Sequence, residues 1–214
     1  MNRHLVIFTR RAQLGAVKRR LAAEIGAVEA LRFHRFMQRK LLLTLAHDRR
    51  WRTWLAVTPD ISQKRDFPGG AGYTLLPQGA GDLGKRMARA FRSLPPGPAV
   101  LIGSDIPGVT SRHIAQAFAC LGRDGAVFGP AEDGGYWLAG FRRTRALPVH
   151  LFAGVRWSGP HALEDTVKTI GRGMGIGYVQ RLRDVDAAAD YEEWRRLCSS
   201  SRGMISTKLQ GRNR

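Results

Sequence analysis

Cysteine is scarce in this sequence of 214 residues, and its scarcity excludes several classes of protein. Cys120 and Cys198 are the only two cysteines, so a disulfide framework and a cysteine-rich zinc site are excluded. No apolar run approaches the roughly 18 residues that a membrane-spanning helix needs. The apolar run after His4 is also shorter than the roughly 7–15 residues of a signal peptide's apolar region. We therefore expect a cytoplasmic protein without a transmembrane segment.

Acidic residues are also scarce, because 17 Asp and Glu face 35 Lys and Arg and the formal net charge is +18. Such an excess indicates an anionic partner, which could be nucleic acid, a membrane surface or a phosphorylated small molecule. The basic residues are spread along the chain, and no recognition helix or aromatic RNA-binding signature accompanies them. We expect no specific nucleic-acid partner, and a nucleic-acid-binding protein remains the less favoured alternative.

The length and composition predict one globular domain over residues 1–198, because 43% of the residues are hydrophobic and no linker interrupts the chain. Residues 199–214 are rich in serine and basic side chains and lack hydrophobic periodicity, so we predict a disordered basic tail there. No pattern in the sequence indicates the oligomeric state.

Short apolar runs alternate with longer segments of helical periodicity, which predicts a mostly parallel sheet covered by helices on both faces. The predicted strands lie near residues 4–8, 53–58, 73–76, 99–103, 126–130, 136–141 and 177–180. The predicted helices lie near residues 17–47, 82–92, 111–121, 161–170 and 187–198. Gly26 is a predicted joint within the first helical segment, and Ser111 is a predicted N-cap.

The residues after the strand at 99–103 are the first candidate site. Ser104 and Asp105 follow this apolar strand directly, and Pro107 stiffens the turn. We expect Ser104 to contact the nucleotide or its phosphates. In open α/β sheets the ligand crevice lies beyond the carboxyl ends of the strands. A carboxylate at that place can hold Mg²⁺ or Mn²⁺, which bind oxygen ligands and bridge to substrate phosphates. The alternative is that Asp105 only caps the turn.

A basic loop after the first strand is the second candidate. Arg10, Gly15, Lys18 and Arg20 stand between the strand and the first helical segment. Glycine lets backbone amides approach an anion, and the cationic side chains can neutralise a diphosphate. The spacing of the glycines matches neither a Walker loop nor a dinucleotide fingerprint. A solvated basic helix start is the alternative interpretation.

Further acidic residues are less decisive. Glu132 and Asp133 lie in a glycine-rich turn between two strands, where they could accept a proton from an attacking hydroxyl or only shape the turn. Asp186 could bind a metal or cap the last helix. We expect Asp184 and Asp186 to project to opposite faces of an extended segment, so that at most one reaches a given metal. Gly81 and Asp82 could border the site and contact the nucleotide or its phosphates, or they could only begin a helix.

Taken together, these motifs resemble those of one bacterial family, a domain of unknown function (DUF2064) that is usually described as a GT-A-type glycosyltransferase. The resemblance covers about residues 3–198. The segments that carry it are Gly15–Leu21, Gln78–Met87, Gly103–Pro107, Phe128–Trp137 and Asp184–Asp186.

The resemblance implies a nucleotide-diphospho-sugar transferase fold, which is a three-layer α/β/α sandwich around a mixed, mainly parallel sheet. It also implies a divalent metal, Mg²⁺ or Mn²⁺, on Asp105 and a donor nucleotide near the first strand. The expected partners are a nucleotide-sugar or a nucleoside triphosphate and a small-molecule acceptor. Our leading hypothesis is glycosyl transfer, in which Asp105 and Asp186 hold the metal and Asp133, or else Glu132, is the base. Nucleotidyl transfer with release of pyrophosphate is the alternative, because a fold alone does not determine the reaction.

Overall fold

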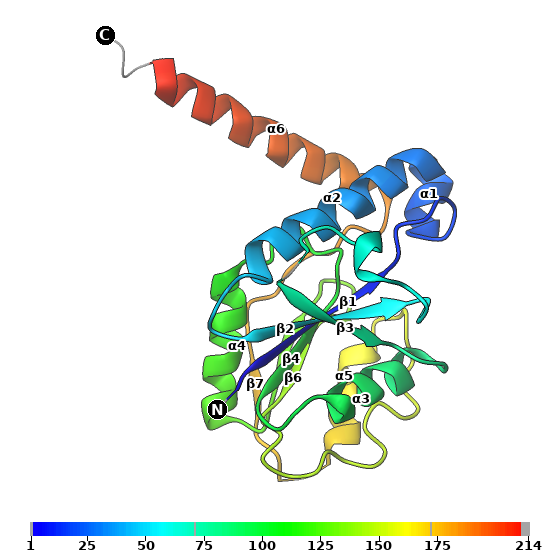
Figure 1. The fold of residues 1–214 in the computed structure, drawn as a ribbon, viewed down its shortest axis with the longest axis vertical. Coiled ribbons are helices and arrows are strands. Elements are labelled where there is room, and N and C mark those ends of the chain that lie inside the picture. The colour runs from blue at the N-terminus through cyan, green and yellow to red at the C-terminus, as the bar shows by residue number, and fades with distance from the viewer. Residues whose placement is uncertain (1, 71, 172, 211–214) are drawn as a thin grey trace.

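A seven-stranded sheet forms the centre of the protein, of which the computed structural model describes residues 2–70, 72–171 and 173–210 (Figure 1). Across the sheet the strands follow in the order β3 (Tyr73–Pro77), β2 (Arg52–Thr58), β1 (His4–Arg10), β4 (Ala99–Ile102), β6 (Tyr136–Phe141), β5 (Ala126–Pro130) and β7 (Ile176–Tyr178). Among the described strands only β6 runs antiparallel to its neighbours, β4 and β5. The mixed, mainly parallel sheet predicted from the sequence is confirmed.

Helices cover both faces of this sheet and complete a three-layer α/β/α sandwich. Alternate residues of a strand point to opposite faces, so Leu5 and Ile7 of β1 lie in one core and Val6 in the other. The first core includes residues of α2 (Ala27–Leu45) and α4 (Ser111–Arg123). The second includes residues of α3 (Leu83–Ser93) and α5 (Ala162–Ile170). The predicted fold class is therefore confirmed.

The segment between β1 and β2 divides into α1 (Arg19–Ile25) and α2, as the sequence predicts. Gly26 joins them with a φ of 87°, a backbone angle that residues other than glycine rarely adopt. The helix predicted from Ser111 begins at that residue, but its N-cap is one residue earlier than predicted. Thr110, rather than Ser111, is the N-cap of α4, and it forms a reciprocal capping pair with His113.

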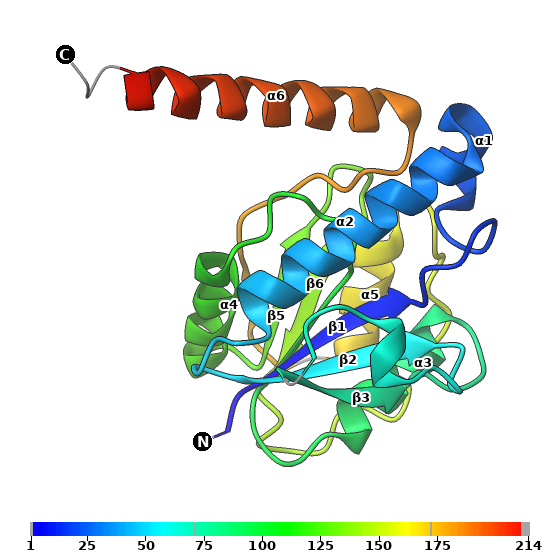
Figure 2. The same cartoon turned by 45° about the horizontal axis from the view of Figure 1, so that its top comes forward.

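The last helix, α6 (Ala188–Gln210), leaves the body of the protein and projects past α2, as Figures 1 and 2 show. Its first turns are anchored because Tyr191 and Trp194 pack edge-on against Phe33 of α2. The disordered tail predicted from residue 199 stays a prediction: α6 includes residues 199–210, and residues 211–214 lie outside the described chain. None of the described helices has the length and apolar character needed to cross a membrane.

Candidate functional site

The loop that joins β1 to α1 carries a cation to the edge of the sheet where β1 and β4 end. Lys18 has a left-handed backbone with a φ of 47°, and its side chain is only 8% exposed. Its Nζ lies 2.6 Å from Asp105 Oδ2 and 2.6 Å from Asp186 Oδ1, and it donates a hydrogen bond to the carbonyl of Val185 at 2.7 Å. Two aspartates far apart in the sequence therefore meet at one cation.

Burial and charge act on Lys18 in opposite directions. Burial alone would lower the pKa of its ammonium group, because loss of water disfavours the charged form. The negative charges of Asp105 and Asp186 outweigh this effect, and the pKa of Lys18 is raised. Lys18 therefore stays protonated near neutral pH and neutralises part of the surrounding acidic charge.

A pocket opens beside this ion pair, and we call it the basic pocket. Its lining residues are Arg10, Gly15, Ala16, Lys18, Arg19, Arg20, Leu21, Asp105, Ser158 and Asp186. The structure thus brings together four of the predicted phosphate-binding residues, which come from the segment between the end of β1 and the start of α1. Guanidinium and ammonium groups around a glycine turn suit the charge and oxygen atoms of a diphosphate.

Buried polar residues hold the start of this loop in place. Gln38 Nε2 donates hydrogen bonds to Thr9 Oγ1 and to the carbonyl of Arg10, both at 2.7 Å. His34 Nε2 lies 2.9 Å from the same carbonyl, and burial lowers the pKa of His34. Ser104, predicted as a phosphate ligand, is buried beneath the loop instead, where its hydroxyl accepts a hydrogen bond from Thr9 at 3.1 Å. Ser104 lines neither the basic pocket nor the second pocket that adjoins it.

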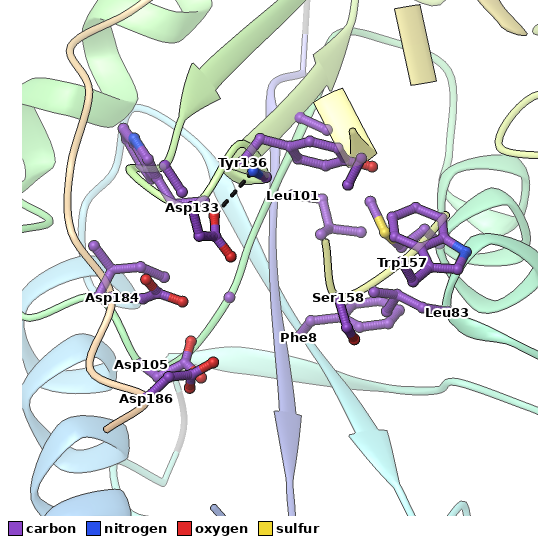
Figure 3. A pocket seen from close by; sticks show the side chains of 18 of the residues that line it. Phe8, Leu83, Leu101, Asp105, Asp133, Tyr136, Trp157, Ser158, Asp184 and Asp186 are labelled. Atoms are coloured by element: carbon purple, nitrogen blue, oxygen red, sulfur yellow. Dashed lines mark hydrogen bonds between the residues drawn. The ribbon is translucent and has the colours of Figure 1, made fainter. Parts of the chain in front are cut away.

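A second pocket, of about 250 Å³, adjoins the basic pocket, and we call it the acidic pocket. Four carboxylates line it, those of Asp105, Asp133, Asp184 and Asp186 (Figure 3). Asp105 and Asp186 belong to both pockets, so the ion pair with Lys18 lies where the two pockets join. The side chain of Asp186 binds Lys18, and Asp190 of α6 accepts hydrogen bonds from the amides of Asp186 and Ala187.

Asp184 corrects one expectation, because Asp184 and Asp186 line the same pocket and do not point to opposite faces. The expectation was wrong because residues two apart on an extended segment lie on the same side. Val185 between them is buried, at 3% exposure. Burial, together with the charges of Asp186, Asp105 and Asp133, raises the pKa of Asp184 to about 6.

The turn between β5 and β6 places its two acidic residues differently. Asp133 lines the acidic pocket, and its Oδ1 accepts a hydrogen bond from the amide of Gly135 at 2.9 Å (Figure 3). Glu132 does not line the pocket, and its Oε2 lies 3.6 Å from Nε of Arg183. Of the two predicted bases, only Asp133 is placed to meet a molecule in the acidic pocket, and its catalytic role stays a prediction.

Gly81 and Asp82 line neither the basic nor the acidic pocket. Asp82 is the N-cap of α3, and its Oδ1 accepts a hydrogen bond from the amide of Lys85 at 2.8 Å. The carbonyl of Gly81 accepts a hydrogen bond from Nε of Arg86 at 2.8 Å. The contacts of both residues thus agree with the alternative that they begin a helix, and their nucleotide contacts stay a prediction.

The donor set suits a hard divalent cation. Mg²⁺ is usually bound by one or two carboxylates, with water and substrate phosphates as the other ligands. Asp105 and Asp186 supply two such carboxylates at one point, next to a basic pocket for phosphates. Within the described chain, no three or more His, Cys, Asp or Glu side chains are arranged to hold a metal by themselves. The residues therefore fit a metal that is shared with a phosphorylated ligand.

Sequence reasoning missed three residues of the site. Asp184 was not predicted as a site residue, because we expected it to point away from the face that carries Asp186. Ser158 lines both pockets and has a left-handed backbone with a φ of 62°, and its neighbour Trp157 lines the acidic pocket. The available signal was the dense mixture of glycine, proline and tryptophan in residues 154–160, which is typical of a structured loop.

Comparisons with known proteins identify the family and the fold. A family model described as "Uncharacterized protein conserved in bacteria (DUF2064)" matches residues 41–159. No curated protein sequence matches the chain. Among solved structures, a proposed nucleotide-diphospho-sugar transferase from Desulfovibrio desulfuricans G20 is 26% identical, with a TM-score of 0.74 over 87% of this chain and 84% of that one.

Two more distant structures share the fold. A CMP:2-keto-3-deoxy-manno-octonic acid synthetase, solved with CTP, is 12% identical with a TM-score of 0.57, over 94% of this chain and 100% of that one. A manganese complex of Rv0371c from Mycobacterium tuberculosis H37Rv is 14% identical with a TM-score of 0.55, over 90% of this chain and 97% of that one. The fold is therefore one that sugar and nucleotide transferases share.

Proposed function

This chain belongs to the DUF2064 family, and from its two adjoining pockets we propose that it transfers a glycosyl group from a nucleotide-sugar to a small-molecule acceptor in a metal-dependent reaction. One observation carries the proposal. Asp105 and Asp186 converge on a single cationic point, the Nζ of Lys18, at the junction of the basic and acidic pockets. A donor whose diphosphate lies in the basic pocket would have its transferred group at this junction.

The residues of the basic pocket would bind the donor's diphosphate. Arg10 and Arg20 can form paired hydrogen bonds to phosphate oxygens, and the left-handed turn at Gly15 lets backbone amides approach them. Lys18 adds a positive charge that offsets the charge that develops as the diphosphate leaves. Asp105 and Asp186 would hold Mg²⁺ or Mn²⁺, which when bound supplies further positive charge to the diphosphate oxygens.

The acidic pocket would present the acceptor. A hydroxyl oxygen of the acceptor forms a bond to the anomeric carbon, and the bond between that carbon and the diphosphate oxygen breaks. The proton of the hydroxyl passes to the carboxylate of Asp133, and the nucleoside diphosphate leaves with the electron pair. The amide of Gly135 fixes the orientation of Asp133 through its 2.9 Å hydrogen bond. The reaction needs no oxidant or reductant.

Nucleotidyl transfer is the second candidate, and the similarity to a CTP-bound synthetase along nearly the whole chain favours it. In that reaction a phosphate oxygen of a phosphorylated acceptor attacks the α-phosphorus of a nucleoside triphosphate, and pyrophosphate leaves. The same basic pocket would then bind the leaving pyrophosphate.

The deciding experiment has two stages. A thermal-shift panel of nucleotides and nucleotide-sugars, each with and without Mn²⁺, identifies the ligand class, because a ligand that binds only the folded state raises the melting temperature. The product is then measured with the ligand that gives the largest metal-dependent shift. Release of nucleoside diphosphate supports glycosyl transfer, whereas release of pyrophosphate supports nucleotidyl transfer. A panel without any metal-dependent shift contradicts both.

A further inference from the structure

One side of the acidic pocket is lined by carboxylates, and the other side is lined by apolar side chains. Opposite the four carboxylates, the lining is formed by the side chains of Phe8, Leu83, Met87, Leu101, Tyr136 and Trp157. We call these six residues the apolar half. Figure 3 shows the carboxylates gathered on one side of the pocket and the labelled apolar side chains gathered on the other.

The apolar half is built from separate elements of the fold. Phe8 lies on β1, Leu101 on β4 and Tyr136 on β6, whereas Leu83 and Met87 lie on α3. Trp157 comes from the loop before α5, and its ring lies 6.3 Å from the ring of Tyr136 in an edge-on arrangement. Leu83 is 43% exposed at the start of α3, so its side chain is accessible to a molecule that enters the pocket.

Tyr136 contributes an apolar wall and not a reactive group. Its hydroxyl accepts a hydrogen bond from Thr166 Oγ1 at 3.2 Å. Burial raises the pKa of Tyr136 well above its usual value, so the phenol stays neutral. Among the described residues that line the acidic pocket, the charged side chains are the four carboxylates and Arg20. The apolar half itself carries no charge.

We propose that the apolar half binds the body of the acceptor, and that the acceptor is a compact apolar alcohol whose hydroxyl reaches Asp133. This inference rests on the proposed function. Asp133 lines the acidic pocket and not the basic one, so a hydroxyl that meets Asp133 belongs to a molecule in the acidic pocket. A polyhydroxylated acceptor would leave its hydroxyl groups without partners against the apolar half, which costs free energy.

The size of the pocket limits the body of this alcohol. The acidic pocket encloses about 250 Å³, which includes the space between the carboxylates. A dry cavity of about 150 Å³ holds a benzene-sized molecule. One aromatic ring or one short branched chain therefore fits the apolar half, and a long lipid chain does not fit entirely within it.

The competing occupant of the apolar half is the nucleobase of the donor, since an aromatic base also stacks on aromatic side chains. The geometry favours the acceptor because the apolar half shares a pocket with Asp133, whereas most of the cationic side chains line the basic pocket. A nucleobase in the apolar half would occupy the space beside Asp133 into which the body of an acceptor would extend.

The test compares two probes that have the same ring size and opposite polarity. Benzyl alcohol has one ring and one hydroxyl, and myo-inositol has one six-membered ring with a hydroxyl on every carbon. Binding of each probe is measured by saturation-transfer NMR, with Mn²⁺ absent because it broadens the signals. We expect benzyl alcohol to bind at least about tenfold more tightly than myo-inositol, because apolar burial contributes only for the first.

A matched pair of variants locates the binding. Leu83→Gln changes a leucine that is 43% exposed at the apolar half, and Leu43→Gln changes a leucine that is 52% exposed on α2, outside both pockets. Both sites are exposed enough for the variants to fold. We expect Leu83→Gln to weaken benzyl alcohol binding by about five- to tenfold and Leu43→Gln to leave it unchanged.

Three results overturn the inference. Equal binding of the two probes removes the preference for an apolar acceptor, and equal binding of benzyl alcohol to both variants places the alcohol elsewhere. A loss of affinity for the nucleoside diphosphate in Leu83→Gln, measured by calorimetry with Mg²⁺, assigns the apolar half to the nucleobase. If the wild-type protein binds no nucleotide, the proposed function fails. Binding of benzyl alcohol is measured without nucleotide, so it shows separately whether the inference about the apolar half fails.

Discussion

The two pockets share an ion pair, but they are built in different ways. Most of the basic pocket comes from one continuous segment, from the end of β1 through the loop to the start of α1, and three of its lining residues, Gly15, Lys18 and Ser158, have a left-handed backbone. The acidic pocket is assembled from strands, helices and loops that are distant in the sequence. A contiguous cationic loop suits any diphosphate, whereas a pocket with many contributors can select its ligand by shape. We infer that donor recognition through phosphate and acceptor selection are separated between the pockets.

The largest effect is expected where the pockets meet. Asp105→Asn keeps the size of the side chain and removes the charge that faces both Lys18 and the metal. Loss of a metal ligand removes several kcal/mol of charge stabilisation, so we expect turnover and metal-dependent nucleotide affinity to fall by about 100-fold or more. Calorimetry with nucleotide, with and without Mn²⁺, measures the affinity.

The matched control is Asp48→Asn, which removes a carboxylate that pairs with Arg50 and lies outside both pockets. It should bind nucleotide like the wild type. If Asp105→Asn also retained wild-type metal-dependent affinity, the metal would not be held at the junction of the pockets.

Lys18→Met tests whether the junction is a single cation site. Without nucleotide, the Lys18 ammonium competes with a divalent cation for Asp105 and Asp186, because its Nζ lies 2.6 Å from each. We therefore expect Lys18→Met to bind free Mn²⁺ about tenfold more tightly, and to bind nucleoside diphosphate about tenfold more weakly. Electron paramagnetic resonance measures free Mn²⁺, and calorimetry measures the nucleotide.

Lys168→Met is the control for the loss of a lysine, because Lys168 pairs with Glu164 on the surface of α5. It should change neither affinity. Weaker binding of free Mn²⁺ by Lys18→Met would show that Lys18 supports the metal and does not compete with it.

Asp105 and Lys18 also show how much of the site can be predicted from the sequence. The order of strands and helices, the joint at Gly26 and the basic loop are local patterns, and the sequence predicts them. Asp105 is predictable as a candidate because it follows the most apolar strand. The partnership of Lys18 with Asp186 spans 168 residues, and no local spacing encodes it. The apolar half is equally difficult to predict from the sequence, because its residues lie in five separate segments and have the apolar character of ordinary core residues.

The shape of the basic pocket depends on side chains beneath it, and Gln38→Met tests this dependence. Gln38 is buried and donates hydrogen bonds to Thr9 and to the carbonyl of Arg10. Methionine has a similar volume but no donor, so two buried acceptors lose a partner. We expect a loss of about 1–3 kcal/mol in the free energy of unfolding, measured with urea. Nucleotide affinity should fall by only several-fold, since the cationic side chains remain.

Leu41→Met on the same helix is the control, because this buried residue loses no hydrogen bond. It should cost less than about 1.5 kcal/mol. Equal losses in the two variants would indicate that Gln38 acts through packing alone, and that its hydrogen bonds do not shape the loop.

Asp184→Asn tests the acidic pocket alone, because Asp184 lines that pocket and not the basic one. Burial and the neighbouring carboxylates raise the pKa of Asp184 to about 6. A carboxyl whose pKa is raised by folding stabilises the native state below its unfolded pKa, near 4, and loses that contribution as the pH rises through the folded value. The ionised Asp184 therefore destabilises the protein above about pH 6.

Asn cannot ionise, so the variant should be more stable than the wild type by about 1 kcal/mol at pH 7.5, a value discounted because the side chain is partly exposed to water. The gain should shrink as the pH falls towards 4. Urea unfolding in EDTA at both pH values measures it. Asp48→Asn gives the opposite sign, because a hydrogen bond from Arg50 lowers the pKa of Asp48 and its loss removes stability at pH 7.5. A variant of Asp184 that loses stability at pH 7.5 would mean that hydrogen bonds to the carboxylate outweigh the cost of its burial and of the neighbouring negative charges.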